Sequence, residues 1–350
     1  MCSSDLSGAI PGCLPPVASA SNQILELFAR SFEQPYVQQG SFGWEAQLST
    51  NSAIEASYLF SKGTHLPHVR DINLGLPSAT LPIGIAGTPT VLSYQRFSLP
   101  RPISTFNRVL QFTSSGNSIY HGLVVQATKR FSSNYSFLAS YTLSKVIDDN
   151  PNVFAIRPNP SNAMFLSDPT NPRADRGPGA NDQRHRLVVS GIWELNHAKH
   201  LSGASRAVLE GWQVSAILTA ETGQPYSGLV GFDLNNDGNF ATDRVPGLGR
   251  DTFYLPASIS LDPRLTRTVR LRDRLQLQMM FEAFNAFNHS NITRVRTTEF
   301  AVVQSPASCG IAGSPCLVRQ NTQTAGLDAF GTPTASSGAR ILQFGAKLIF

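Results

Sequence analysis

An acidic and amide-rich segment is the best candidate for metal chemistry in this sequence. Residues 233–239 read DLNNDGN, which places oxygen-bearing side chains at alternate positions and a glycine where the chain must turn sharply. This pattern is typical of the first half of a calcium-binding loop. The twelfth position would carry a bidentate acid, but Arg244 stands there, with Asp243 one residue earlier as a partial substitute. Two interpretations stay open, and calorimetry with Ca²⁺ separates them: a loop that binds no metal, or a calcium site of Asp233, Asn235, Asp237 and Asp243.

A second polar segment, 182–186 (DQRHR), brings an acid and a histidine within three residues. General acid–base or nucleophilic chemistry would also need a nucleophile, yet no G-x-S-x-G elbow, H-E-x-x-H pair, phosphate-cradling loop or dinucleotide fingerprint occurs. On a strand, His185 would alternate with Arg184 and Arg186, which favours a solvated strand end or a charge pair. We therefore predict no catalytic residues and no enzyme. A hydrolase remains the alternative, and it would require Asp168, Asp175, Asp182 and His185 to cluster.

The cysteines give weaker information. Cys309 and Cys316 have six residues between them in a Gly-, Ser- and Pro-containing stretch, which suits a small loop disulfide in an oxidising compartment. No histidine follows at the spacing of a zinc finger, and no cofactor other than calcium is indicated.

Composition narrows the class of protein. The chain has 350 residues, of which only 15% are charged, against about 25% in an ordinary soluble domain. Its apolar runs are only a few residues long, whereas a transmembrane helix needs about 20. An all-β soluble sandwich and a transmembrane β-barrel remain. The 23 arginines and 5 lysines are scattered, so nucleic acid is not an expected partner.

Alternation of apolar and polar residues with a period of two dominates the chain and predicts strands. In the segment 135–143, for example, tyrosine, phenylalanine, alanine and leucine share one face, and serine and threonine occupy most of the other. We expect roughly nine to eleven strands, including 36–49, 53–62, 119–131, 134–146, 187–195, 212–220, 261–271, 275–287 and 340–350.

The spacers between these strands alternate in length. Short turns fall at 132–133 and 272–274, whereas 147–182, 223–256 and 288–339 are long. Short turns at one end and long loops at the other are typical of an outer-membrane barrel. A sandwich would instead have turns every 8–12 residues at both ends. The predicted fold is therefore an all-β, antiparallel transmembrane β-barrel with long extracellular loops.

The last strand carries a local signal. Leu342, Phe344, Ala346, Leu348 and the terminal Phe350 form one apolar face. A terminal aromatic residue on an alternating strand is similar to the signal that the barrel assembly machinery reads, with Phe350, Leu348 and Phe344 as its main residues.

Several segments together resemble the C-terminal barrel portion of a TonB-dependent receptor of the Oar-like type, whose members begin with a carboxypeptidase-regulatory-like domain. The resemblance covers about residues 23–350 and rests on order and spacing. The segments are PYVQQ (35–39), EASY (55–58), SKGTHL (61–66), YHGL (120–123), ASYTLSK (139–145), DQRHR (182–186), GWQVS (211–215), GQPY (223–226) and EAFNAFN (282–288).

The resemblance implies a bacterial outer-membrane receptor for energy-coupled uptake. Family members form a 22-stranded barrel around a plug, so this chain would supply roughly the ten C-terminal strands as a fragment. Expected partners are outer-membrane lipid, the barrel assembly machinery, an unknown small ligand or peptide, and the TonB complex through an N-terminal part that this sequence lacks. A non-transporting surface adhesion barrel is a further alternative.

The N-terminal segment 1–22 is set apart from this pattern. It lacks the basic and apolar regions of a secretory signal, and codons for residues 2–6 can match the end of a sequencing adapter. We expect it to be non-native or disordered, with the barrel portion at 23–350. An ordinary native tail is the alternative.

Overall fold

The structure is a computed structural model that describes residues 23–77, 80–149, 166–195, 202–240, 242–272, 275–303, 309, 315–320 and 329–350. The expectation for residues 1–22 therefore lies outside the described residues. Among the described residues, no helix is both long and apolar enough to span a bilayer. The helical elements of the described residues include a short α1 (Gly203–Leu209) and a 3₁₀ turn, Pro172–Asp175.

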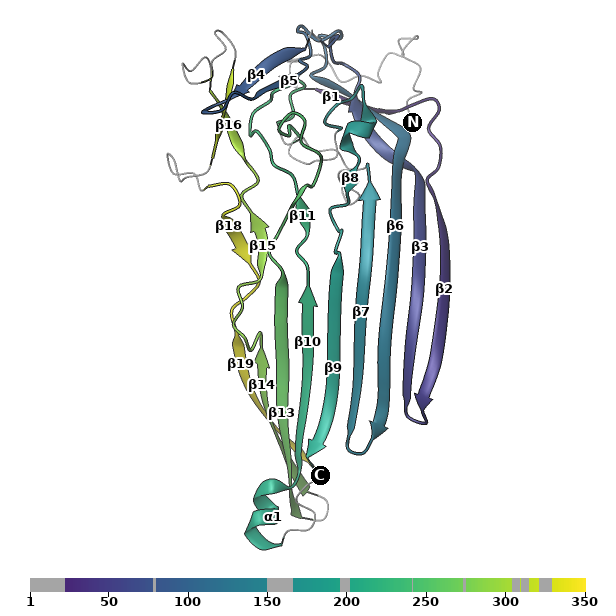
Figure 1. Cartoon of the computed structure of the whole chain (residues 1–350), viewed down its shortest axis with the longest axis vertical. Coiled ribbons are helices and arrows are strands. Elements are labelled where there is room, and N and C mark those ends of the chain that lie inside the picture. Colours follow the sequence, from purple (N-terminus) through teal and green to yellow (C-terminus); the bar gives the residue numbers. More distant parts are fainter. Residues whose placement is uncertain are drawn as a thin grey trace.

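Nine long strands form one antiparallel sheet, and each of the nine segments named from alternation is confirmed as a strand (Figure 1). Two shorter strands join the sheet: β1 (Ile24–Phe28) runs parallel to β6, and β8 (Gly177–Pro178) pairs with β7. In order across the sheet the long strands are β19 (Ile341–Ile349), β14 (Leu275–Phe284), β13 (Ser258–Arg272), β10 (Trp212–Glu221), β9 (His185–Leu195), β7 (Tyr135–Asp148), β6 (Arg108–Ser132), β3 (Ser52–Asp71) and β2 (Tyr36–Ser49).

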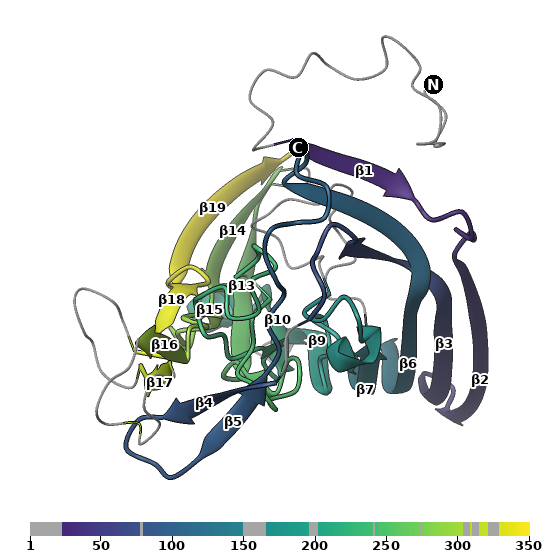
Figure 2. The same cartoon turned by 90° about the horizontal axis from the view of Figure 1, so that it is seen from above.

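Strands that follow one another along the chain lie side by side through most of this sheet, and short turns join them at one end. The turn between β6 and β7 has Ser133 at φ 52° and Asn134 at φ 71°. Two consecutive left-handed residues match the twist of a hairpin. Seen along the strands, the sheet is an open arc that begins at β2 and ends at β19 (Figure 2).

The register of the sheet separates an apolar face from a polar face. In one row, Tyr58 on β3 lies opposite Leu123 on β6, which lies opposite Leu143 on β7. Three residues earlier on β3, Glu55 lies opposite Gln126, and Gln126 lies opposite Ser140 on β7. Because directly opposed residues point to the same side of a sheet, the apolar row and the polar row lie on opposite faces.

Apolar side chains on the first face stay exposed to the surroundings of the chain. Phe344 is 60% exposed, Phe281 52%, and Trp193 48%. In water, a sheet that exposes a whole apolar face is unstable unless another layer of the protein covers it. In a bilayer, lipid covers that face.

The hydrophobic core lies instead in the long loops at the other end. Ile83, Val230, Leu234, Val245, Phe300 and Leu317 form one buried cluster. They come from three different connections of the long sheet, between β3 and β6, between β10 and β13, and between β14 and β19. We call this packed loop region the cap.

The connections that form the cap contain short strands of their own. A four-stranded sheet lies in the cap, in the order β16 (Phe300–Val303), β17 (Cys316–Arg319), β4 (Leu81–Ile85) and β5 (Val91–Tyr94) (Figure 2). Two hairpin-like pairs complete it: β11 (Pro225–Tyr226) with β12 (Phe253–Tyr254), and β15 (Ile292–Val295) with β18 (Pro333–Ser336). These strands are too short for alternation to reveal them.

Substitutions on β10 test which face meets lipid. Leu218 lies on the apolar face, opposite Val189 and Leu261, and the next residue, Thr219, lies on the polar face. We expect Leu218→Arg to lower the free energy of unfolding in a bilayer by about 2–4 kcal/mol, because a cation would enter the lipid. Thr219→Arg should change it by less than about 1 kcal/mol. Equal losses in the two variants, measured by urea unfolding in lipid vesicles, would contradict this assignment.

Candidate functional site

Buried arginine–aspartate pairs tie the loops of the cap together. Arg250, from the connection between β10 and β13, pairs with Asp148 at the end of β7, and the two side chains are 3% and 6% exposed. From the same connection, Arg244 reaches Asp175, at 2.6 Å between the nitrogen and the oxygen. Each pair therefore joins the β10–β13 connection to the chain that leaves β7.

A third pair joins the β3–β6 connection. The Arg101 Nη1 atom is 2.6 Å from the Asp71 carboxylate, and its Nη2 atom donates to the main-chain oxygen of Asp237 at 2.7 Å. Arg108, at the start of β6, donates to the main-chain oxygen of Gly238. Arg101 in the β3–β6 connection and Arg108 at the start of β6 thus hold the 233–239 segment, which belongs to the β10–β13 connection.

The 233–239 segment is a tight turn built by its own side chains. Asp237 receives a backbone N–H bond from Asn239 at 2.6 Å, and it donates its own N–H to the Asn235 side chain at 2.9 Å. The Asp233 carboxylate accepts from the Gly238 N–H at 2.9 Å. Gly238 has φ 86°, a left-handed conformation that suits glycine. One side-chain oxygen at each of the three positions therefore accepts a backbone N–H of the turn, while the second Asp233 oxygen, Oδ1, is buried without a hydrogen-bond partner among the described residues.

Burial raises the pKa values of two carboxyl groups in this region, those of Asp237 and Asp243. The pKa of Asp243 is raised to about 8, first because the carboxyl is buried and next because Asp237 lies nearby. The pKa of Asp237 is raised to about 6, again by burial first, and Asp233 adds to the shift. Asp243 still accepts the Leu234 N–H at 3.0 Å. At neutral pH the Asp243 carboxyl is therefore mainly protonated and able to donate a hydrogen bond.

The calcium site of Asp233, Asn235, Asp237 and Asp243 stays a prediction. Within the part of the chain that the structure describes, no three His, Cys, Asp or Glu side chains form a group that could hold a metal ion. One oxygen of each candidate residue accepts a backbone N–H, although the second Asp233 oxygen is buried without a partner among the described residues, and Arg244 at the twelfth position pairs with Asp175.

A pocket of about 490 Å³ opens in the cap beside the weak acid Asp243. Its walls come from three of the long connections. Polar, aromatic and aliphatic side chains all contribute; they include Ser93, Tyr94, Phe97, Ser167, Asp168, Asn235, Asp243 and Leu248. Such a mixture of apolar walls and a few directed polar groups is typical of small-molecule sites.

The four residues of the hydrolase alternative are each bonded to other partners. Asp175 binds Arg244 and the Ser167 hydroxyl, and Asp182 accepts the Val146 N–H at 2.7 Å. The remaining two follow the same pattern: Asp168 accepts from Thr170, and the His185 Nδ1 atom is 2.7 Å from the Tyr141 hydroxyl. None of these contacts joins one of the four residues to another.

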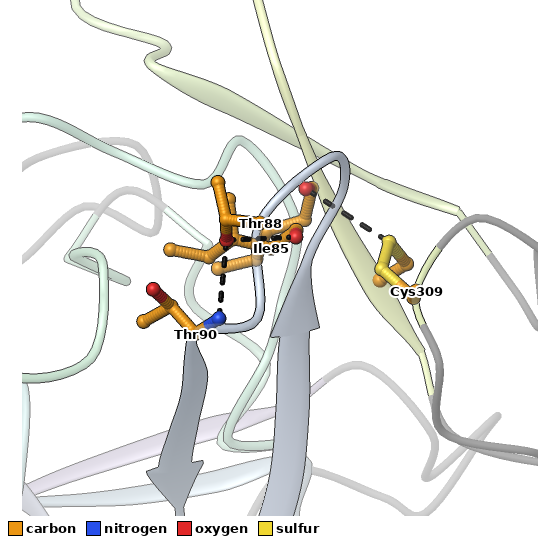
Figure 3. Close-up of a disulfide and its surroundings, with 6 residues drawn as sticks. Ile85, Thr88, Thr90 and Cys309 are labelled. Carbon is orange, nitrogen blue, oxygen red and sulfur yellow. Dashed lines mark hydrogen bonds between the residues drawn. A yellow bond between two sulfur atoms is a disulfide. The ribbon is translucent and has the colours of Figure 1, made fainter.

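A disulfide joins Cys309 to Cys316 in the cap, with 5.9 Å between their Cα atoms (Figure 3). It lies against β4, where a Cβ added at Gly84 would come within 3.1 Å of the Cys309 main-chain oxygen. The turn after β4 is closed by Thr88, which donates to the Ile85 oxygen at 3.1 Å. The bond thus secures a loop segment directly beside the cap sheet.

The C-terminal strand has the arrangement that its alternation predicts. Phe344 opposes Phe281, and Leu348 opposes Leu277, on the edge strand β19. The terminal Phe350 follows the strand and is 95% exposed. Its role as an assembly signal stays a prediction.

The sequence analysis predicted neither the buried arginine contacts of the cap nor the pocket. Arg101, Arg108 and Arg250 stand in no recognisable motif, and the abundance of arginine over lysine is the only signal that pointed toward them. Their partners lie 30 to 136 residues away along the chain.

A lipid-exposed antiparallel sheet, short turns at one end and a folded loop cap at the other define an outer-membrane β-barrel protein. The chain belongs to the outer membrane beta barrel domain family, whose model matches residues 6–248. Its place is therefore the bacterial outer membrane, where its apolar face contacts lipid.

Two solved structures are similar to this chain. The outer membrane transporter YddB from Escherichia coli matches at 9% identity with a TM-score of 0.44, over 78% of this chain and 31% of that one. The FrpB iron transporter from Neisseria meningitidis (F3-3 variant) matches at 12% identity with a TM-score of 0.41, over 77% and 29% respectively. The chain thus spans about a third of the length of these structures. No curated protein matched it.

The raised pKa values predict how the stability of the cap depends on pH. Between about pH 4 and pH 8 the folded cap binds more protons at Asp237 and Asp243 than the unfolded chain does, so these groups stabilise it less as pH rises. We expect the free energy of cap opening to fall by roughly 1 kcal/mol or more from pH 5 to pH 8. Hydrogen exchange of the 225–250 peptide measures this.

Asp243→Asn is the matched variant, because an amide oxygen can still accept the Leu234 N–H but does not titrate. The decrease in the free energy of cap opening between pH 5 and pH 8 should be smaller in this variant. An identical pH profile in the two proteins would contradict the assignment, since the rest of the chain is unchanged between them.

Proposed function

We propose that this chain is the C-terminal portion of an energy-coupled, TonB-dependent receptor barrel of the Oar-like type, which captures a small ligand or peptide outside the cell and passes it through the barrel lumen. The observation that carries the proposal is the position of the cap pocket. It lies among the long connections of a membrane sheet, the end that faces outside the cell in barrels of this kind.

The open edges of the sheet support a larger barrel. In the described strand order, β2 and β19 each have one long-strand neighbour. An unpaired backbone edge in lipid costs several kcal/mol for each unsatisfied group. We infer that further strands pair with these edges in the assembled receptor, and that a plug and a TonB-contacting segment are contributed from outside this sequence.

The chemistry of the pocket suits recognition by hydrogen bonding. Asn235 and Ser167 belong to different connections, and the Asn235 Nδ2 atom donates a hydrogen bond to the Ser167 main-chain oxygen at 3.1 Å. Beside them, Asp243 offers a protonated carboxyl. Ligand capture at this site needs no covalent step, so we propose a receptor rather than an enzyme. Assembly would proceed through recognition of the apolar C-terminal strand.

The experiment compares cells that carry the wild-type gene, a deletion and a blocked pocket. Ser93→Trp places a bulky side chain in the pocket, and Val91→Trp on the same strand, away from the pocket lining, is the matched control. Depletion of small molecules from a defined peptide and metabolite mixture is measured by mass spectrometry, with and without a proton uncoupler.

We expect at least one component of the mixture to be depleted by the wild type and by Val91→Trp. Depletion should fall at least about tenfold in the deletion, in Ser93→Trp and in uncoupled cells. Depletion that is insensitive to the uncoupler would contradict energy coupling. Surface binding without depletion would instead indicate an adhesion barrel.

A further inference from the structure

Charge is distributed over the two faces of the membrane sheet in an unequal way. Between the short turns and the cap, the acidic residues of the long strands fall on the polar face: Glu45, Glu55, Glu194, Glu221, Asp262 and Glu282. The apolar face has basic residues at its two ends, with Lys62 and Lys145 near the cap and Lys129 and Arg267 near the turns. The band between these ends is apolar.

The separation of the two ends matches a bilayer. On β7, Tyr135 and Lys145 lie on the same face, ten residues apart, which is about 33 Å along a strand. The tilt of about 35–45° in outer-membrane barrels reduces this to a height of about 25 Å, the height of the apolar band. Lys145 therefore reaches the level at which lipid headgroups begin.

Three basic residues lie near this level on neighbouring strands. His121 on β6 lies directly opposite Lys145 on β7 and Phe60 on β3. Lys62 is two residues beyond Phe60 on the same face of β3. Two strand spacings and the offset of two residues separate the two lysines by about 12 Å between Cα atoms, so their extended side chains can converge on one anion above His121.

The histidine of this group is held in place. Its Nδ1 atom is 2.6 Å from the Tyr58 hydroxyl, and the two rings are stacked with centroids 6.1 Å apart. Lys62 and Lys145 are both exposed, and neither has a hydrogen-bond or ion-pair partner among the residues that the structure describes. The cluster is thus an ordered imidazole flanked by two available ammonium groups.

The basic residues at the turn end differ, because both are engaged. The Lys129 ammonium donates to the Ser132 main-chain oxygen at 2.8 Å and lies 3.6 Å from the centre of the Tyr135 ring. Arg267 lies over the Trp212 ring at 4.9 Å. Among the described residues of the long strands, the lysines of the apolar face without a side-chain partner are therefore those at its cap end, Lys62 and Lys145.

We propose that Lys62, His121 and Lys145 form a binding site for the phosphate of a phosphorylated lipid headgroup in the outer leaflet. The ammonium groups supply charge and hydrogen-bond donors to phosphate oxygens, and the apolar face below them takes the acyl chains. The absence of acidic residues from this part of the face removes repulsion. This site lies on the outside of the sheet and is independent of ligand uptake through the cap.

Native mass spectrometry of the full chain in detergent micelles tests the site, with diphosphoryl lipid A or phosphatidylcholine as the added lipid. The test variant is Lys62→Gln with Lys145→Gln. The control is Lys347→Gln with Arg270→Gln, which removes the same charge from exposed positions on the polar face. Heat-modifiable migration verifies that each variant is folded.

We expect lipid A to remain bound to the wild type and the control, and its dissociation constant to rise at least about tenfold in the test variant. Equal weakening in both variants would show attraction by net charge alone and overturn the site. So would an unchanged constant in the test variant, equal binding of phosphatidylcholine, or full displacement of lipid A by millimolar inorganic phosphate, which would indicate a site for the free anion.

Discussion

The cap depends on buried pairing of arginine with aspartate. Arg250 with Asp148 and Arg244 with Asp175 join one connection to another in places where water is largely excluded. Removing two charges from water is costly, and the pair repays that cost only while both partners are present and well placed. These pairs therefore restrict how the connections of the cap can pack. In any other arrangement, charged side chains would be buried without their partners.

This pairing explains why the long connections outside the sheet pack into a defined cap. A membrane sheet exposes one face to lipid and the other to the lumen, so it offers no interior against which long connections can pack. Here the connections pack against each other, around Ile83, Val230 and Leu317, and the arginines fix their relative positions. The pocket and the weak acid Asp243 are consequences of that packing, because both arise where the connections meet.

Sequence patterns predicted the sheet well and the cap poorly, for a physical reason. The faces of β7 and β19 follow from alternation, because a strand between lipid and water must change polarity at every residue. The cap depends on contacts distant in sequence, such as Arg101 with the Asp237 oxygen, 136 residues apart, and no local pattern encodes them. The 233–239 motif shows the same limit. Asp, Asn and Gly at these spacings suit a calcium loop, but they also suit a turn whose side chains bond to its own backbone, as Asp237 does with Asn239.

The loss of one partner from a buried arginine–aspartate pair tests most directly whether these pairs hold the cap together. Arg250→Met should lower the free energy of cap opening by about 3–5 kcal/mol, because it leaves Asp148 buried without its partner. Arg186→Met removes an arginine that is 51% exposed and pairs with Glu221 on the sheet, and it should cost less than about 1 kcal/mol. Hydrogen exchange of the 225–250 peptide in the full chain measures both. Protection in Arg250→Met equal to that of the wild type would contradict the central role of the buried pairs.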